Sequence, residues 1–278
     1  MGTHHICSTC GTQFQETAAP PDRCPICEDE RQYVNWNGQA WTSLDVLRQR
    51  HRNVLREEEP GLTSIVTEPS FAIGQRALLL QTTSGNILWD CLSLIDESTV
   101  QAIQARGGLS AIAISHPHYY SSMVEWSRAF ESVPIFLHAG DRKWIMRPDP
   151  SIQCWQAETH RLGEGVTLIH CGGHFSGATI LHWAGGAGGR GALLTGDTIQ
   201  VVLDRLHVSF MRSYPNLIPL SAAAVQRIVD AVQPHAFDRI YGAFAGRTIP
   251  HAAKTALARS ADRYVKAIRG LCEQEDHL

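Results

Sequence analysis

The sequence predicts an α/β fold with a small metal-binding module at its N-terminus. Short apolar runs typical of buried strands alternate along the chain with stretches of helical pattern. Histidine or aspartate follows three of these predicted strands, and two Cys-x-x-Cys pairs stand near the N-terminus. Together these features indicate one metal site at a sheet edge and a second one in the N-terminal module.

Length and composition are those of an ordinary globular protein. The 278 residues suffice for one large α/β domain with a small appendage, or for two domains. The formal net charge of −3 gives no reason to expect nucleic acid or an acidic membrane as a partner. No stretch approaches the roughly 18 apolar residues that cross a bilayer. Residues 1–10 lack a basic region and an apolar region, so we expect no secretory signal and a cytoplasmic protein.

The N-terminal cysteines are predicted to bind a metal ion. Without an export signal, thiols are expected to be reduced, and two Cys-x-x-Cys turns let four thiolates surround one soft cation. A segment of about thirty residues cannot build an adequate core, so the ion would stabilise the fold. The predicted ligands are Cys7, Cys10, Cys24 and Cys27. The remaining cysteines are expected to be single and buried; they are Cys91, Cys154, Cys171 and Cys272.

The cysteine module, residues 1–35, resembles a zinc ribbon and also rubredoxin, whose knuckles read Cys-x-x-Cys-Gly and Cys-Pro-x-Cys. Glu28 follows the second pair where rubredoxins usually have Gly. We therefore favour structural zinc over iron, which stays an alternative. The module is not strongly basic, which argues against nucleic-acid binding. Residues 36–60 are predicted to form a linker helix, capped by Ser43 and running to about Glu59. Trp36 and Trp41 are expected to pack the module against the main domain, residues 61–278.

The main domain is predicted to alternate strands and helices. Hairpin residues 82–86 and the glycine pair at 107–108 separate the first elements. Strands are predicted at 63–67, 77–81, 87–89, 111–114, 134–137, 166–171, 180–184, 191–195 and 237–241. Helices are predicted at 97–106, 122–130, 221–232 and 250–271. Residues 149–156 read as irregular, and 208–220 as a loop over the pocket. The glycine-rich run 185–189 reads as a hairpin, since no phosphate-binding sequence follows it.

Three strand ends carry potential metal ligands. His116 and His118 follow the strand at 111–114, and at extended spacing their side chains point to one side. Pro117 between them stiffens the backbone. His174 follows two glycines after the strand at 166–171, and Asp197 follows the strand at 191–195. His138 also ends a strand, but a lone histidine there is expected to be structural.

The order of these motifs, His-x-His, Gly-His-x-x-Gly and Gly-Asp, resembles the metallo-β-lactamase fold from roughly Gly61 to the C-terminus. The resemblance implies a four-layer αββα sandwich. It also implies that Asp90 positions the metal ligands without binding the ion itself, although a loop-capping role is an equal alternative. Three usual ligands of a second ion are replaced, by Tyr120, Ser121 and Ala243. This departure argues that the His/Asp site binds one metal ion and not two.

The resemblance and the ligand set predict a metal-dependent hydrolase. Three histidines with an open fourth position are typical of catalytic zinc, which lowers the pKa of a bound water to about 7 and supplies a hydroxide nucleophile. Asp197 is a further ligand or orients the hydroxide, and Tyr119 or Tyr120 could stabilise an oxyanion. The expected partner is a small-molecule ester, thioester, lactone or phosphoester. Further pocket candidates are Trp155, His207 and Tyr214.

Two other functions stay open. His116, His174 and Asp197 form a two-His-one-carboxylate set, as in non-haem iron oxygenases. Persulfide dioxygenases, which have this fold, hold one iron in this way. A depleted site could instead belong to a protein that binds a metal or ligand without turnover. Cys171 is more readily a small core residue than a ligand or redox thiol. The oligomeric state, including a homodimer, is left open.

Overall fold

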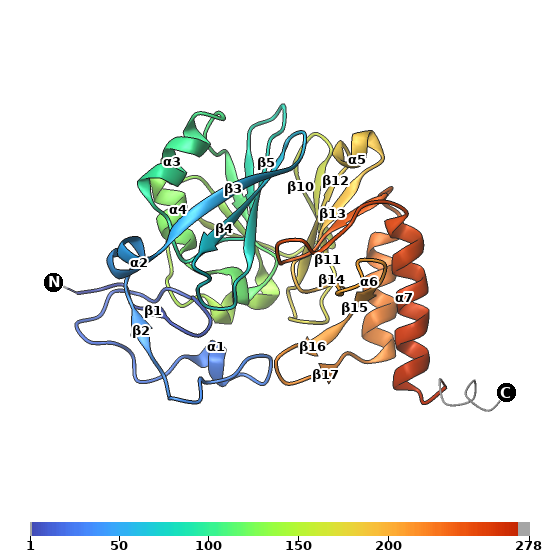
Figure 1. Cartoon of the computed structure of the whole chain (residues 1–278), viewed down its shortest axis with the longest axis horizontal. Coiled ribbons are helices and arrows are strands. Elements are labelled where there is room, and N and C mark those ends of the chain that lie inside the picture. The colour runs from blue at the N-terminus through green and yellow to red at the C-terminus, as the bar shows by residue number, and fades with distance from the viewer. Residues whose placement is uncertain (1, 272–278) are drawn as a thin grey trace. The chain divides into compact units, whose positions relative to one another are not determined.

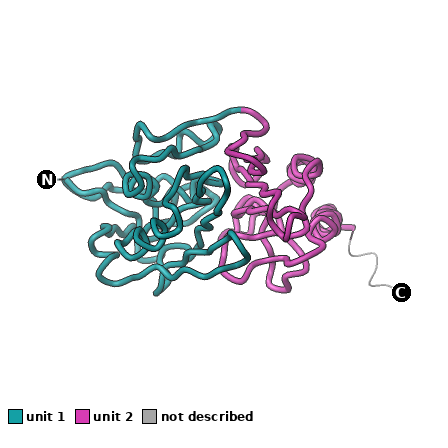
Figure 2. The backbone as a smooth tube through the Cα atoms, turned by 90° about the horizontal axis from the view of Figure 1, so that it is seen from above, with its two compact units in different colours: residues 1–156 teal, residues 157–278 magenta. Residues whose placement is uncertain are grey.

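The structure is a computed structural model that describes residues 2–271 (Figure 1). Cys272 lies outside the described residues. The chain divides into two compact units, residues 1–156 and 157–278 (Figure 2). Each unit contains one large sheet and its own helices. The four-cysteine module belongs to the first unit.

A seven-stranded sheet forms the body of the first unit, in the order β3-β4-β5-β6-β7-β8-β9. Its strands are β3 (Arg52–Glu59), β4 (Leu62–Glu68), β5 (Arg76–Leu80), β6 (Ile87–Trp89), β7 (Ala111–Ala113), β8 (Ile135–His138) and β9 (Ile152–Trp155). Pairing is antiparallel from β3 to β6 and parallel from β6 to β9. Strands β5, β6 and β7 are buried along their whole length, which agrees with sequences that are apolar apart from Arg76 at the start of β5.

Two helices connect the parallel strands of this sheet and lie on one side of it (Figure 1). They are α3 (Glu97–Gln104) and α4 (Met123–Ala129). Asp96 caps α3 by accepting a 2.8 Å hydrogen bond from the main-chain N–H of Thr99. The 3-10 helix Pro117–Tyr119 lies between β7 and α4, and a second one spans Ala139–Trp144.

The N-terminal module has little regular structure. Strand β1 (Ile6–Cys7) pairs with β2 (Trp41–Thr42), and α1 (Pro25–Glu28) begins after Cys24 and contains Cys27. Helix α2 (Leu44–Arg50) begins at Ser43, whose hydroxyl accepts a bond from the N–H of Val46. The small hydrophobic cluster beside the module consists of Ile6, Leu47 and Leu94. The four cysteines are themselves buried within the module, which agrees with a fold that depends on a bound ion.

The second unit is built on a six-stranded sheet in the order β10-β11-β12-β13-β18-β19. Its strands are β10 (Thr159–Gly163), β11 (Val166–His170), β12 (Thr179–Trp183), β13 (Ala192–Leu194), β18 (Arg239–Tyr241) and β19 (Thr248–Ile249). Helices α6 (Ala222–Val232) and α7 (Ala253–Ile268) pack side by side, and Ile228 and Leu257 join the strand residues Ile180 and Ile240 in one core. Each unit thus has the sheet and helices expected of one half of an αββα sandwich.

Smaller elements occupy the connections of the second unit. Helix α5 (Gly186–Gly189) is a single turn between β12 and β13, within the predicted glycine-rich hairpin. Strands β14 (Gln200–Val201) and β15 (Val208–Ser209) form one two-stranded sheet, and β16 (Met211–Ser213) and β17 (Ile218–Pro219) form another. None of the helices within residues 2–271 has the length and hydrophobicity needed to cross a membrane.

Several sequence-based predictions of local structure were wrong. The linker helix ends at Arg50, and residues 52–59 form the edge strand β3. The charged residues of β3 are suited to a sheet edge, but they look like the exposed face of a helix. The segment predicted as irregular at 149–156 contains β9, and Trp36 is 99% exposed rather than packed. Trp41 does pack, edge-on against Phe14 within the module. A domain boundary within 35–61 stays a prediction.

Candidate metal centres

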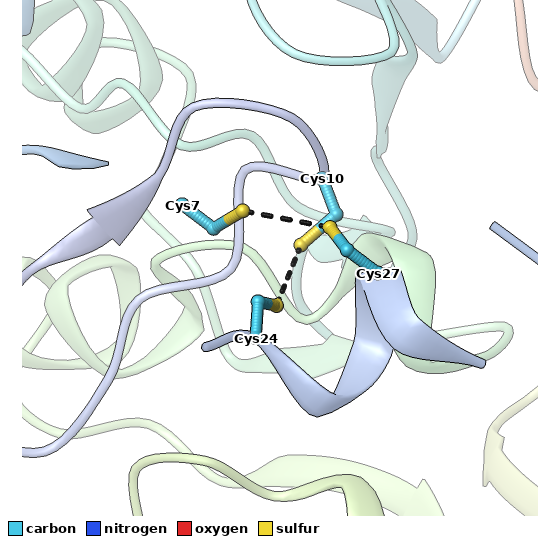
Figure 3. A group of neighbouring side chains, drawn as sticks. All are labelled: Cys7, Cys10, Cys24 and Cys27. Atoms are coloured by element: carbon cyan, nitrogen blue, oxygen red, sulfur yellow. Dashed lines mark hydrogen bonds between the residues drawn. The ribbon is translucent and has the colours of Figure 1, made fainter. Parts of the chain in front are cut away.

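The four predicted cysteine ligands form one buried cluster. The Sγ atoms of Cys7, Cys10, Cys24 and Cys27 all lie within 4.8 Å of one another (Figure 3). Two of the S–S separations are 3.5 and 3.7 Å, too long for a disulfide. A zinc ion with Zn–S bonds of about 2.3 Å would separate tetrahedral sulfurs by about 3.8 Å, so the cluster fits such an ion. The side-chain amide of Gln39 adds a hydrogen bond to Cys7 Sγ at 3.2 Å.

Two histidines lie at the end of β7. His116 and His118 are buried, and their ring centroids lie 5.2 Å apart. His116 Nδ1 is 2.9 Å from the hydroxyl of Ser115, which leaves Nε2 as the ligand atom. The ring of Tyr119 packs edge-on against that of His116 at 4.5 Å. The 3-10 turn that begins at Pro117 therefore places both imidazoles at the strand end.

His174 and Asp197 each follow a glycine. A Cβ at Gly173 would lie 2.9 Å from Cδ1 of Ile228, and its φ of 84° also favours glycine. His174 Nδ1 donates a 3.0 Å hydrogen bond to the carbonyl of Met211, so Nε2 is again the ligand atom. The hydroxyl of Tyr214 donates to the carbonyl of Asp197 at 3.0 Å.

The four predicted His and Asp ligands form a second group. One ligand atom from each of His116, His118, His174 and Asp197 lies within 4.8 Å of the others, and all four residues are buried. Three imidazoles and a carboxylate are suitable ligands for zinc and for iron. The group does not include His138, whose Nδ1 accepts a 3.2 Å bond from the N–H of Gly140 and whose ring packs on Trp155.

The three positions that replace usual ligands have other contacts or no donor atom. The hydroxyl of Ser121 accepts a 3.1 Å hydrogen bond from the side-chain amide of Gln75. Ala243 is buried and has no ligand atom. Tyr120 is buried beside a cavity of about 10 Å³, far too small for a substrate. Burial, with the nearby Asp141, raises the pKa of Tyr120 well above its usual value.

Other candidate residues have structural surroundings. Cys171 belongs to the core of the second unit, where burial raises the pKa of its thiol. His207 Nδ1 forms a 2.7 Å hydrogen bond with the carboxylate of Asp204. Sequence reasoning missed Gln75 and the carbonyl of Met211 as partners of the candidate site residues. Neither could be found from a motif, since both act through contacts between distant parts of the chain.

Comparisons with known proteins identify a family and a fold for this chain. No protein-family model matches the chain. A Bacillus subtilis (strain 168) protein described as "Uncharacterized protein YmaE" is 49% identical over 267 residues, which are 95% of this chain and 97% of YmaE.

Solved structures share the fold at low sequence identity. VMB-1 is 13% identical with a TM-score of 0.58, and covers 78% of this chain and 98% of its own. The DIM-1 metallo-β-lactamase is 12% identical with a TM-score of 0.58 and the same coverages. The metallo-β-lactamase FIM-1 from Pseudomonas aeruginosa, in a mono-zinc form, is 12% identical with a TM-score of 0.56 and covers 77% of this chain and 96% of its own. The chain therefore belongs to the same protein family as YmaE and has the metallo-β-lactamase fold.

Proposed function

We propose that the protein is a metal-dependent hydrolase that binds one catalytic ion through His116, His118, His174 and Asp197. The observation that carries this proposal is the grouping of four buried ligand atoms within 4.8 Å of one another. Buried histidines and a carboxylate at such distances are costly to leave without a cation. The donor set suits zinc, and the structural relative FIM-1 has a mono-zinc form.

The surrounding residues orient this donor set. Zinc at this site would lower the pKa of a coordinated water to about 7 and so supply a nucleophile at neutral pH. Ser115 and the carbonyl of Met211 engage Nδ1 of His116 and of His174, which directs both Nε2 atoms to the ion. Of the two tyrosine candidates, we favour Tyr119 as a donor to developing negative charge, because its ring contacts His116. We assign Tyr120 to packing, because the cavity beside it holds only about 10 Å³.

The proposed substrates are small molecules with an ester, thioester, lactone or phosphoester bond. The fold alone does not select among them, because the same fold supports several reactions. A single ion follows from Tyr120, Ser121 and Ala243 at the positions of usual second-ion ligands. A cytoplasmic location stays a prediction from the use of the cysteines.

An iron oxygenase is the second candidate function, because the donor set includes a carboxylate. His116, His174 and Asp197 alone would complete a two-His-one-carboxylate set. The two candidates differ in the role of His118. In the hydrolase it is a ligand, whereas in the oxygenase it is not required for metal binding.

The variant His118→Ala separates these functions. The metal content and the hydrolysis of an ester, thioester, lactone and phosphoester panel would be measured for wild type, His118→Ala, the double variant His116→Ala/His174→Ala and the exposed control His251→Ala. The hydrolase predicts zinc-dependent turnover that is lost in His118→Ala and kept in His251→Ala. Iron that remains bound in His118→Ala but is lost in His116→Ala/His174→Ala, with no hydrolysis by wild type, would favour the oxygenase. Bound metal with neither hydrolysis nor oxygenation of a substrate would favour a binding protein.

A further inference from the structure

The loop that presents His116 and His118 ends in a conformation that its own sequence does not favour. Ser121 is buried and has a φ of 42°, in the left-handed region that serine rarely adopts. Such a residue persists only when surrounding contacts hold it. The contacts made by Ser121 and Ser122 therefore decide whether the loop keeps its shape.

One of these contacts comes from the N-terminal module, and another leads to the module through Ser93. The main-chain N–H of Gln13 donates a 3.0 Å hydrogen bond to the carbonyl of Ser121. The hydroxyl of Ser122 donates to the carbonyl of Ser93 at 2.9 Å, and the hydroxyl of Ser93 donates to the carbonyl of Gly11 at 2.7 Å. The module thus contacts the loop directly through Gln13 and indirectly through Ser93.

Two hydrogen bonds from Arg147 join the module to helix α4, which follows the loop. The guanidinium of Arg147 donates to Oε1 of Gln13 and, at 2.6 Å, to the carboxylate of Glu125 in α4. The main-chain N–H of Gln15 donates to the carbonyl of Met146 at 3.0 Å. Residues 11–15 are therefore part of the support of both the loop and α4.

The position of residues 11–13 depends on the first cysteine knuckle. The N–H of Gly11 donates to the carbonyl of Cys7 at 2.8 Å, and the N–H of Cys7 donates to the carbonyl of Thr12 at 3.0 Å. The thiol of Cys10 lies 3.5 Å from the hydroxyl of Thr12. An ion bound by Cys7 and Cys10 would fix this turn, because both knuckle cysteines would be its ligands.

We propose that the four-cysteine module positions the loop of the His/Asp site. The ion in the cysteine cluster holds the turn at 11–13, and Gln13 and Ser93 transmit that constraint to Ser121 and Ser122. Gln13 and Ser93 are thus positioning residues, since neither belongs to the ligand group. A loosened loop should also weaken metal binding at the His/Asp site, and this consequence rests on the proposed function. The constraint on the loop itself does not depend on that function.

Hydrogen–deuterium exchange of the loop tests the constraint. The amides of Tyr119, Tyr120 and Met123 are bonded within the loop at 3.0, 3.2 and 2.9 Å and report its integrity. Full-length Ser93→Ala and Cys24→Ser would be compared with wild type. The matched control is Ser127→Ala, which also removes a buried serine hydroxyl bonded to a main-chain carbonyl, that of Val133.

We expect Ser93→Ala to raise the exchange rate of these three amides about 2- to 10-fold, the range for one lost hydrogen bond. Cys24→Ser should raise it further, while the amides of β5 stay protected in both. Exchange in Ser93→Ala equal to that in Ser127→Ala would overturn the proposal. If Cys24→Ser does not fold, the comparison of Ser93→Ala with Ser127→Ala still tests the proposal.

Cobalt binding separates this proposal from the proposed function. Co²⁺ in the cysteine cluster gives thiolate charge-transfer absorption, whereas Co²⁺ held by histidine and aspartate does not. We expect Ser93→Ala to bind Co²⁺ at the His/Asp site about 2- to 10-fold more weakly than Ser127→Ala. A wild-type protein that binds no Co²⁺ there would contradict the proposed function, while the exchange result would still test the loop.

Discussion

The main-chain N–H of Ser115 donates a 2.7 Å hydrogen bond to Oδ1 of Asp90. Asp90 directly follows β6, and Ser115 lies two residues after β7, which is paired with β6 in parallel. Asp90 is buried and has a φ of 62°, a conformation that Asp and Asn tolerate better than most residues. The carboxylate thereby fixes the backbone immediately before His116.

Loss of this carboxylate should weaken metal binding at the His/Asp site. We expect Asp90→Ala to lower the affinity about 10- to 100-fold, the usual effect of removing a group that orients ligands. Asp90→Asn keeps both the acceptor oxygen and the tolerance for positive φ, so it should lie close to wild type. Competition titration with a chromophoric chelator measures both. Equal affinities of Asp90→Ala and wild type would assign Asp90 a loop-capping role only.

The lowered pKa of Asp96 predicts that the stability of the protein depends on pH. Burial raises the pKa of its carboxyl, but hydrogen bonds from Thr99, Ser98 and Asn53 outweigh this, and the net pKa lies below the ordinary value. A carboxyl whose pKa is lower in the folded state stabilises the fold above its unfolded pKa of about 3.9, and this contribution is lost as the pH falls.

Asp96→Ala should therefore destabilise the protein by about 1 kcal/mol at pH 7, as is usual for a lost helix cap. The difference from wild type should shrink as the pH is lowered through the pKa of Asp96. Urea unfolding of both proteins between neutral and acidic pH measures this. A difference that stays constant with pH would show that the charge of Asp96 does not contribute.

Two tryptophans near the module should differ in their effect on stability. Trp36 is 99% exposed, so Trp36→Ala should change the free energy of unfolding by less than about 0.5 kcal/mol. Trp41 packs edge-on against Phe14 with ring centroids 4.9 Å apart. Trp41→Ala should cost more than about 1 kcal/mol. Chemical denaturation of the two variants compares them directly, and a larger loss for Trp36→Ala would mean that Trp36 packs in solution.

Metal removal should distinguish the cysteines by their reactivity. Cys7, Cys10, Cys24 and Cys27 are protected from alkylation while an ion holds them, and a chelator should expose them to iodoacetamide. Cys91 and Cys171 are buried, and burial raises the pKa of each thiol, so both should stay unmodified in the folded protein. Peptide mass spectrometry gives the modified fraction at each position. Equal labelling of the module cysteines with and without chelator would argue against a bound ion.

The candidate His and Asp ligands could be picked out from the sequence because each comes after an apolar strand. The run 111–114 delivers His116 and His118, and glycines precede His174 and Asp197. Potential ligand atoms of both predicted groups lie within 4.8 Å of one another. Local pattern carries this information, since a buried strand and the residue at its end are neighbours in sequence.

The remaining features depend on contacts between distant residues. Strand β3 was predicted as helix because its charges suit either an exposed helix or a sheet edge, and only its pairing with β4 decides. Strand β9 pairs with β8 across a long connection. The bond from Gln13 to Ser121 joins main-chain atoms, so no side-chain pattern could indicate it.

Metal content per chain, measured by plasma mass spectrometry without chelator, tests the central claim most directly. The comparison is between wild type and the double variant His116→Ala/His174→Ala. Our account predicts about two ions in wild type, one in the cysteine cluster and one in the His/Asp site, and about one in the variant. The same content in both proteins would contradict it, because the His/Asp group would then bind no ion.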